Sequence, residues 1–333
     1  GLCGSIRAGI FVHDAARATI HDNAIVDIRD EPMAACQQGI AIVVGSSSSR
    51  TSGTATIFDN VVTGYQKGGI SVSNAGSSAV IRGNQLQGAG PTSLLVQNGI
   101  QVAGGATATI DANRIAAHSY TPFSRVSTGI LLIDANADTS GNTLEENQVG
   151  IYLVDSSGRH DANSVYATAS GTQSPAYWGI IVDAPPPGRV PQPYEPVVLR
   201  ASRLMLETVS DARGVQTVAV TNNELDSDNS AGGVGLQADA GYGVLDIDLT
   251  AANNFVRNWE RGVYVAQCGG AGCSGAGYRA ATFHHNSITG NGTGFDNGSA
   301  GGLGVTALEN WWGTETGPAA PNNPGGSGNA LVG

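Results

Sequence analysis

Three aspartates end similar apolar segments and are the residues best placed to do chemistry. Asp134, Asp155 and Asp183 close the segments Gly-Ile-Leu-Leu-Ile-Asp, Gly-Ile-Tyr-Leu-Val-Asp and Gly-Ile-Ile-Val-Asp. If these segments pair as neighbouring strands, the carboxylates lie about 4.8 Å apart and repel one another. Such a group shares a proton, binds a cation, or serves as the carboxylate pair of a glycoside hydrolase.

Three interpretations of these aspartates stay open. Aspartate is a common turn residue, so all three can be solvated residues at the start of a turn. Asp134 and Asp155 share one offset from their glycines and can hold Ca²⁺, the one cofactor that the sequence suggests, whereas the shorter offset of Asp183 can turn it elsewhere. In a catalytic interpretation all three are candidates, and the neighbouring aromatic residues are candidates for substrate binding: Tyr152, Tyr177 and Trp178.

A glycine followed by an aliphatic, a variable and an aliphatic residue recurs through the chain. The glycines are Gly9, Gly39, Gly69, Gly99, Gly129, Gly150, Gly179, Gly233, Gly262 and Gly294, and the first four steps are each 30 residues long. The first and third residues after nine of these glycines are aliphatic, as in Ile130 and Leu132. This alternation predicts a strand with one buried face, and a fixed period of about 20–50 residues predicts a solenoid.

A second series places an asparagine at the end of the next segment of each repeat. Its members are Asn23, Asn60, Asn84, Asn113, Asn142, Asn163, Asn223, Asn254, Asn286 and Asn310. An apolar residue follows two positions later each time. Asparagine tolerates the left-handed backbone conformation of a sharp bend, and stacked amides can hydrogen-bond to one another. We therefore expect an asparagine ladder and need no ligand to explain the residue type.

These repeats resemble the right-handed parallel β-helix, the pectin-lyase-like fold of many bacterial secreted and surface proteins. The resemblance covers nearly the whole chain and implies an all-β fold, a single-stranded right-handed parallel β-helix (solenoid) of about ten coils with an asparagine ladder. The family includes lyases, glycoside hydrolases, epimerases and adhesins, so the resemblance does not select a function. The signature clusters of its polygalacturonase branch (Asn-Thr-Asp, Asp-Asp, Gly-His-Gly and Arg-Ile-Lys) are missing.

Two segments depart from the repeat within a single predicted β-helix domain, residues 1–333. Residues 184–217 form an insertion rich in proline, which cannot join a central strand ladder. Because the outward positions beside it are apolar, we expect residues 185–209 to pack over the outside of the strands between 129 and 183. Residues 310–333, with Trp311, Trp312 and a Gly/Pro-rich tail, are expected to cap the last coil, although the tryptophans can alternatively stack on a sugar.

The four cysteines fall into two local pairs. Cys3 and Cys36 are one coil apart, and Cys268 and Cys273 enclose a short Gly-rich loop. Neither pair has the cysteine and histidine spacing of a zinc site, so we predict two disulfides and an oxidising, extracytoplasmic location, secreted or on the cell surface. Residue 1 already lies within a repeat, and we expect that further chain precedes it.

Composition excludes two classes of partner. The net charge of −11 argues against nucleic acid and anionic membrane surfaces, whose phosphates attract clusters of Lys and Arg. The sequence contains no apolar run long enough for a transmembrane helix. The predicted partner is a polysaccharide or cell-surface glycan, with a homo-oligomer or an end-to-end assembly of the solenoids as a further possibility.

Two classes of function remain. The preferred one is a non-catalytic extracellular surface or adhesin-type module that presents an elongated glycan- or partner-binding face. The alternative is a polysaccharide-active enzyme (lyase, glycoside hydrolase or epimerase) with an acidic groove on the coils between residues 129 and 183. The scarcity of basic residues and the missing signature clusters favour the first.

Overall fold

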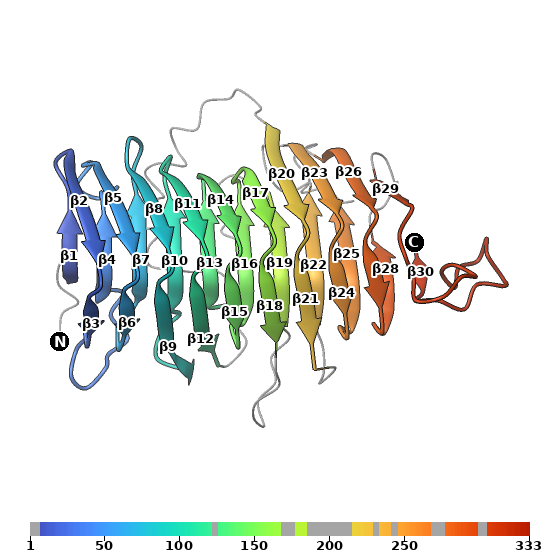
Figure 1. The fold of residues 1–333 in the computed structure, drawn as a ribbon, viewed down its shortest axis with the longest axis horizontal. Helices are drawn as coiled ribbons and strands as arrows, with labels where there is room; N and C mark the ends of the chain where they lie inside the picture. Colours follow the sequence, from blue (N-terminus) through green and yellow to red (C-terminus); the bar gives the residue numbers. More distant parts are fainter. Residues whose placement is uncertain are drawn as a thin grey trace.

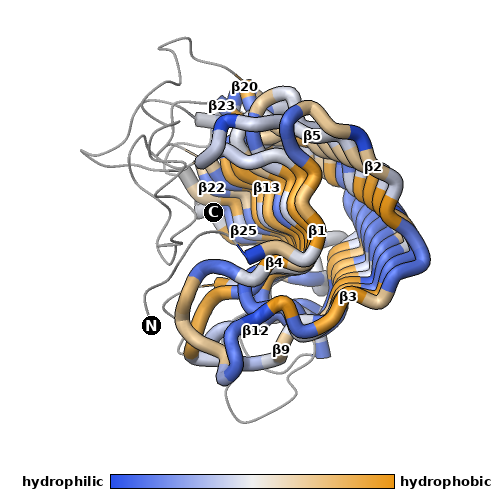
Figure 2. Tube along the Cα trace, turned by 90° about the vertical axis from the view of Figure 1, so that its left-hand side faces the viewer, coloured by the Kyte–Doolittle hydropathy of each residue, from blue (hydrophilic) through white to orange (hydrophobic). Residues whose placement is uncertain are grey.

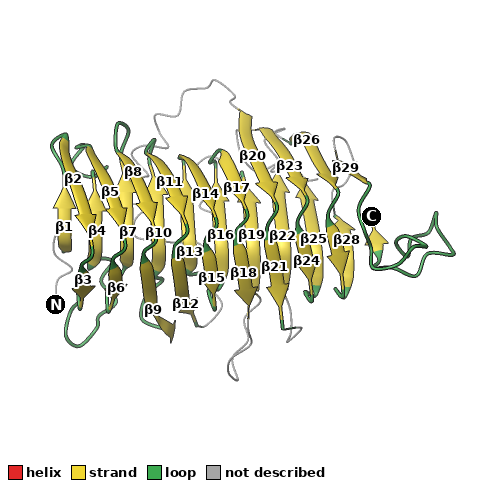
Figure 3. Cartoon of the chain, viewed as in Figure 1, coloured by secondary structure: helices red, strands yellow, loops and turns green. Residues whose placement is uncertain are grey.

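The chain winds into a parallel β-solenoid with three sheets and no helix in the part that is described (Figures 1 and 3). The computed structural model describes residues 7–121, 126–167, 177–184, 215–228, 233–240, 246–267, 277–298 and 305–333. Every strand pair in the three sheets is parallel, and each strand pairs with the equivalent strand of the coils before and after it. The predicted fold class, including the solenoid of about ten coils, is confirmed.

Sheet A contains the strands that follow the repeat glycines. Its order is β1 (Ala8–Val12), β4 (Ile40–Val44), β7 (Gly68–Ser73), β10 (Asn98–Ala103), β13 (Thr128–Ile133), β16 (Val149–Val154), β19 (Tyr177–Asp183), β22 (Gly233–Ala240), β25 (Arg261–Gln267), β28 (Thr293–Asn297) and β30 (Leu331–Val332).

Sheets B and C complete each coil. Sheet B contains β2 (Ala16–His21), β5 (Gly53–Phe58), β8 (Ser78–Arg82), β11 (Thr107–Asp111), β14 (Asn136–Ser140), β17 (Gly158–Asp161), β20 (Val215–Thr221), β23 (Asp246–Ala252), β26 (Tyr278–His284) and β29 (Val305–Leu308). Sheet C contains β3 (Ala24–Val26), β6 (Val61–Thr63), β9 (Gln85–Thr92), β12 (Arg114–Tyr120), β15 (Thr143–Glu145), β18 (Ser164–Ala167), β21 (Glu224–Ser227), β24 (Phe255–Arg257) and β27 (Ser287–Thr289).

One continuous hydrophobic core runs the length of the solenoid between the three sheets. Alternate residues of each strand point inward, so that Ile130, Leu132, Ile151 and Leu153 are fully buried in sheet A. The view along the axis shows apolar stripes on the strands of sheet A, including β13, that repeat from coil to coil (Figure 2). The predicted inward parity is confirmed.

The asparagine ladder is complete and forms the corner between sheets B and C. Each side-chain amide donates to the Oδ1 atom of the asparagine in the next coil, over nine bonds from Asn23 to Asn310 that measure 2.9–3.1 Å. The left-handed bend itself is made one residue earlier than expected, for example by Asp59 (φ 55°) and Asn222 (φ 57°). The ladder asparagine is therefore selected for its amide and not for its backbone conformation.

In two repeats the sequence spacing selects the wrong residue as the repeat glycine, namely Gly39 and Gly233. The residue opposite Gly9 is Ala41 and not Gly39, because Ala8 pairs with Ile40 and Ile10 with Ile42. In the same way Gly179 lies opposite Gly235 and not opposite Gly233, because Trp178 pairs with Val234 and Ile180 with Leu236. Both errors are two residues long, so the inward parity is preserved while the level along the strand is shifted.

The two segments that depart from the repeat are described only in part. Ala184 is buried after β19, and residues 215–217 belong to β20. The intervening residues, which include the whole range 185–209, lie outside the described residues, so their predicted packing over the strands stays a prediction. At the other end, Trp312 is 7% exposed and packs into the main core, whereas Trp311 is 49% exposed. The tail then returns as β30, which pairs with β28.

Candidate functional site

The outer face of sheet A carries a separate apolar cluster next to the predicted acidic residues. Its buried members are Val126, Leu131, Val149, Tyr152, Val154 and Ile181, with Ile133 and Trp178 packed against them. Apart from Val126, which precedes β13, these side chains stand on β13, β16 and β19, and the cluster is separate from the main core. Beyond β19 the outward-facing residues become more polar, because Ile181 pairs with Gln237 on β22 and Gln237 pairs with Tyr264 on β25.

Asp183 lies at this boundary and is the most deeply buried of the predicted aspartates. It ends β19 with its side chain on the outer face and is only 9% exposed. The hydroxyl of Tyr152 donates a short hydrogen bond to Asp183 Oδ2. Burial, assisted by the neighbouring carboxylates of Asp239 and Asp155, raises the pKa of Asp183 to about 8 although the Tyr152 hydrogen bond opposes the shift.

Asp134 and Asp155 occupy a different level from Asp183. Each lies just after its strand in a left-handed conformation, with φ of 47° and 46°, and the two residues are stacked in successive coils. Asp183 lies one position earlier, because it pairs with Val154. The predicted row of three carboxylates is therefore a stacked pair, with the third carboxylate displaced onto the neighbouring strand.

Burial raises the pKa of both stacked carboxyls. The Asp134 residue still reaches solvent, and partial burial of its carboxyl raises its pKa above the ordinary value. Asp155 is half-buried, and burial together with the Asp134 charge raises its pKa to about 7. The Asp155 Oδ1 atom is buried and has no hydrogen-bond partner.

Sequence reasoning missed a fourth aspartate, Asp239 on β22. Asp239 pairs directly with Asp183, and its Oδ1 atom is also buried without a hydrogen-bond partner. Burial raises the pKa of Asp239 to about 6. The signal that could have found it is the offset from glycine: Asp239 follows Gly235 by four residues, as Asp183 follows Gly179. Choosing Gly233 as the repeat glycine concealed this equivalence.

The predicted substrate-binding aromatic residues do not all reach the site. Tyr152 contacts Asp183, and Trp178 lies in the outer cluster, where its Nε1 donates to Gln237 Oε1 at 2.8 Å. Tyr177 instead packs against the main core. Tyr278 donates to the carbonyl oxygen of Ala266 at 2.8 Å. Burial raises the pKa of Tyr278, and the nearby charges of Asp239 and Asp183 add to the shift.

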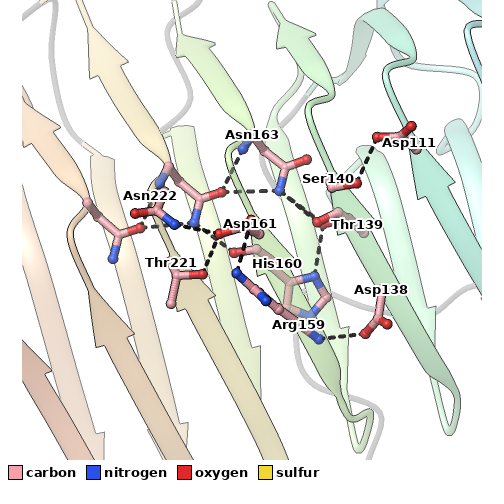
Figure 4. A network of polar contacts seen from close by, with 12 residues as sticks. Asp111, Asp138, Thr139, Ser140, Arg159, His160, Asp161, Asn163, Thr221 and Asn222 are labelled. Carbon is pink, nitrogen blue, oxygen red and sulfur yellow. Dashed lines mark hydrogen bonds and ion pairs between the residues drawn. The ribbon is translucent and has the colours of Figure 1, made fainter.

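A second polar network, on sheet B, differs from the acidic site because its outer carboxylates already have partners (Figure 4). Asp161 Oδ1 accepts hydrogen bonds from Thr221 Oγ1 at 2.6 Å and from Asn222 Nδ2 at 2.7 Å. On the inner side, the His160 Nδ1 atom lies 3.0 Å from Thr139 Oγ1, and burial lowers the pKa of His160 to about 4. The outer carboxylate is stabilised by its own neighbours and is not arranged for a ligand.

The predicted calcium site and the two predicted disulfides stay predictions. Across the described ranges, no three or more His, Cys, Asp or Glu residues are grouped as metal ligands, and calcium at Asp134 and Asp155 stays a prediction. Cys36 is buried and is not a free thiol. Cys3, Cys268 and Cys273 lie outside the described residues, so both predicted pairings stay predictions.

In the described part of the chain, no helix is both long and apolar enough to cross a bilayer.

Comparison with known proteins identifies the family of the chain. A search of curated proteins and a search of solved structures each found no match. The family model for the right-handed β-helix region matches residues 8–174, which include β1 to β18. The chain therefore belongs to the right-handed β-helix family.

Proposed function

We propose that the protein is an extracytoplasmic polysaccharide-active enzyme that hydrolyses a glycan at the Asp183–Asp239 pair. The observation that carries the proposal is the direct pairing of the two aspartates across β19 and β22, together with the unpartnered, buried Oδ1 of Asp239. Paired residues on neighbouring strands are about 4.8 Å apart. That spacing is close to the separation of about 5–5.5 Å between the two carboxyls of a retaining glycoside hydrolase.

The environments of the two carboxyls suit different roles. With a pKa of about 8, Asp183 is protonated at neutral pH and can donate a proton to the leaving-group oxygen. With a pKa of about 6, Asp239 is mostly ionised at pH 7 and can attack the anomeric carbon. The Tyr152 hydroxyl, which donates to Asp183 Oδ2, leaves the other oxygen of that carboxyl to carry the proton. Asp183 then acts as the base that activates water for the second step.

The acidic surroundings favour hydrolysis over elimination. A lyase must neutralise the carboxylate of a uronic acid and supply a base to remove the adjacent proton. Asp239, which is mostly ionised at pH 7, and the neighbouring Asp134 and Asp155 would repel a polyuronate. The chain contains only 16 Lys and Arg residues that could offset this repulsion. The substrate class that fits this site is therefore an uncharged polysaccharide.

The experiment is a screen of uncharged and uronate-containing polysaccharides for new reducing ends and for unsaturated products. We expect reducing ends without unsaturated absorbance, and a loss of at least about 100-fold in Asp183→Asn and Asp239→Asn. Asp248→Asn, on the outer face of sheet B, is the matched control and keeps full activity. Unsaturated products, or activity that survives both substitutions, would contradict the proposal.

A non-catalytic glycan-binding module is the second candidate, and a different surface favours it. A shallow groove of about 370 Å³ crosses the outer face of sheet B over β5, β8, β11 and β14. Its outward-pointing lining is mainly hydroxyl and amide side chains: Thr54, Thr56, Ser78, Thr107, Thr109 and Asn136. Binding on a glycan array without turnover, lost on substitution in this groove and unaffected by Asp183→Asn, would select this function.

A further inference from the structure

The residue that follows each ladder asparagine points outward from sheet C, and two of these residues are large aromatic side chains. Phe255 follows Asn254 and is 55% exposed, and Trp311 follows Asn310 and is 49% exposed. Ser287, which follows Asn286, lies between them, because it pairs with Phe255 on one side and with Trp311 on the other. The two rings therefore stand in one row, separated by a small residue.

The ladder fixes the distance between the backbones of the two aromatic residues. Asn254 donates to Asn286 at 2.9 Å, and Asn286 donates to Asn310 at 2.9 Å. The backbone N–H groups of Phe255 and Trp311 each donate at 2.8 Å to the carbonyl oxygen of the preceding coil's asparagine. The two residues are thus held two strand spacings apart, about 10 Å along the axis.

Trp311 is anchored on both sides of its backbone. Its carbonyl oxygen accepts a hydrogen bond of 2.8 Å from the Ile288 N–H, and the next residue, Trp312, is buried in the core. An exposed indole on such a rigid backbone loses little conformational entropy when a ligand binds. This surface is already organised for a flat, partly apolar partner.

A polar row runs beside the aromatic one. Arg257, two residues after Phe255 on β24, is held by Glu224 at 2.6 Å and Asp226 at 2.9 Å. Thr289 pairs with Arg257 on the neighbouring strand. Rings in one row with donors and acceptors in the next match a ligand that has apolar faces and polar edges, which is the chemistry of a pyranose sugar.

We propose that Phe255 and Trp311 form a binding surface for a linear, uncharged polysaccharide that lies along the solenoid axis. A pyranose unit advances an extended glycan by about one strand spacing, so alternate sugars stack on the two rings while Ser287 leaves room for the sugar between them. Nucleic acid bases also stack on aromatic rings, but Glu224 and the net charge of −11 repel their phosphates. The surface is on sheet C and does not depend on the acidic pair on sheet A.

The test is affinity electrophoresis of the whole protein in gels that contain hydroxyethyl cellulose, soluble mannan or polygalacturonate. We expect retardation by at least one of the two uncharged polymers and none by polygalacturonate. Phe255→Ala and Trp311→Ala each weaken binding about tenfold, since stacking on one aromatic ring is worth on the order of one power of ten in affinity. The double variant abolishes retardation. Val61→Ala, an exposed residue that follows ladder Asn60, is the matched control and binds normally.

Three outcomes would overturn this surface as a glycan site: no retardation by either uncharged polymer, retention that survives the double variant, or wild-type self-association that the double variant abolishes without a glycan. Equal melting temperatures of Trp311→Ala and the wild type exclude misfolding as the cause of lost binding. Asp183→Asn retains binding in this assay. A failure of the catalytic proposal is thereby distinguished from a failure of this one.

Discussion

Asp183 and Asp239 are direct cross-strand neighbours on the outer face of sheet A, and burial raises the pKa of both carboxyls. Their pairing predicts a bell-shaped dependence of hydrolysis on pH. The rate should rise as the group with a pKa of about 6 ionises and fall as the group with a pKa of about 8 loses its proton, with a maximum near pH 7. A pH series of initial rates checks this, and a rate that still increases above pH 9 contradicts it.

Stability should fall as the pH rises from about 6.5 to 8.5. Asp155 and Asp183 have folded-state pKa values of about 7 and 8, above the ordinary value of 3.8, so the folded chain holds protons that the unfolded chain has released. That stabilisation is fully present at low pH and is lost as the pH passes the folded-state values. Melting temperatures across this range should decrease, and Asp183→Asn should flatten the decrease while Asp248→Asn leaves it unchanged.

Below pH 6.5 the buried histidines act in the opposite direction. Burial lowers the pKa of His118 and of His160 to about 4, so the unfolded chain takes up these two protons first. The stability that the neutral histidines contribute is lost as the pH drops from 6.5 towards 4, and this loss offsets the gain from the protonated aspartates. The interval above pH 6.5 therefore isolates the aspartates. A melting temperature that rises from pH 6.5 to 8.5 is inconsistent with buried, protonated carboxyls in the folded state.

Asn113→Ala should destabilise the solenoid by about 3 kcal/mol, because it leaves buried donors without their acceptor. Asn113 Oδ1 accepts from both the backbone N–H and the side-chain amide of Asn84, at 2.9 Å each. Asn23→Ala, at the exposed first position of the ladder, is the control and should cost less than about 1 kcal/mol. Urea denaturation measures both, and equal losses would mean that burial of the amide is not what matters.

Gly129→Ala should destabilise by about 1–3 kcal/mol through steric overlap. A Cβ atom at this position would lie 2.6 Å from Leu144 Cδ2 and 2.9 Å from the carbonyl oxygen of Gly150. Gly325→Ala is the matched control, because a Cβ atom there meets nothing within 4 Å. Thermal denaturation of the two variants should separate them, and a Gly129→Ala variant as stable as the control would show that the coils can move apart locally.

The two adjacent tryptophans should differ sharply in their contribution to stability. Trp312→Ala removes a side chain that packs in the core and should cost about 3–5 kcal/mol. Trp311→Ala should be nearly neutral, because its ring stands in solvent. The free energies of unfolding measured in urea check the difference, and similar losses for both variants would contradict the distinct roles of core plug and exposed ring.

The local sequence pattern was sufficient to predict the architecture because every coil must bury one face of its strands and continue the asparagine ladder. One parity of the sheet A strands is aliphatic since it faces the core, and one asparagine per coil is required since its amide continues the ladder. Both rules act on residue type at short range. They survive even the two-residue register errors at Gly39 and Gly233, because a shift of two leaves the inward face inward.

The site was predicted less well because it depends on register between strands far apart in sequence. Glycine recurs close to the true repeat position, and spacing alone did not distinguish Gly233 from Gly235. That choice decides whether Asp239 is equivalent to Asp183. The sequence also did not show how deeply each side chain is buried. Asp183 is deeply buried, and Tyr177 packs against the main core while Trp178 packs in the outer cluster, because of side-chain packing on the two faces of sheet A.

The asparagine ladder makes the level of a coil independent of its length. Asn142 and Asn163 are 21 residues apart and Asn163 and Asn223 are 60 residues apart, yet their amide bonds measure 2.9 Å and 3.1 Å. Residues inserted between two ladder asparagines therefore leave the position of every other coil along the solenoid axis unchanged. Such a scaffold can accept new segments without redesign of its core, and its longest addition follows directly after Asp183 in sequence. Grafting foreign loops at that position is a practical route to altered specificity.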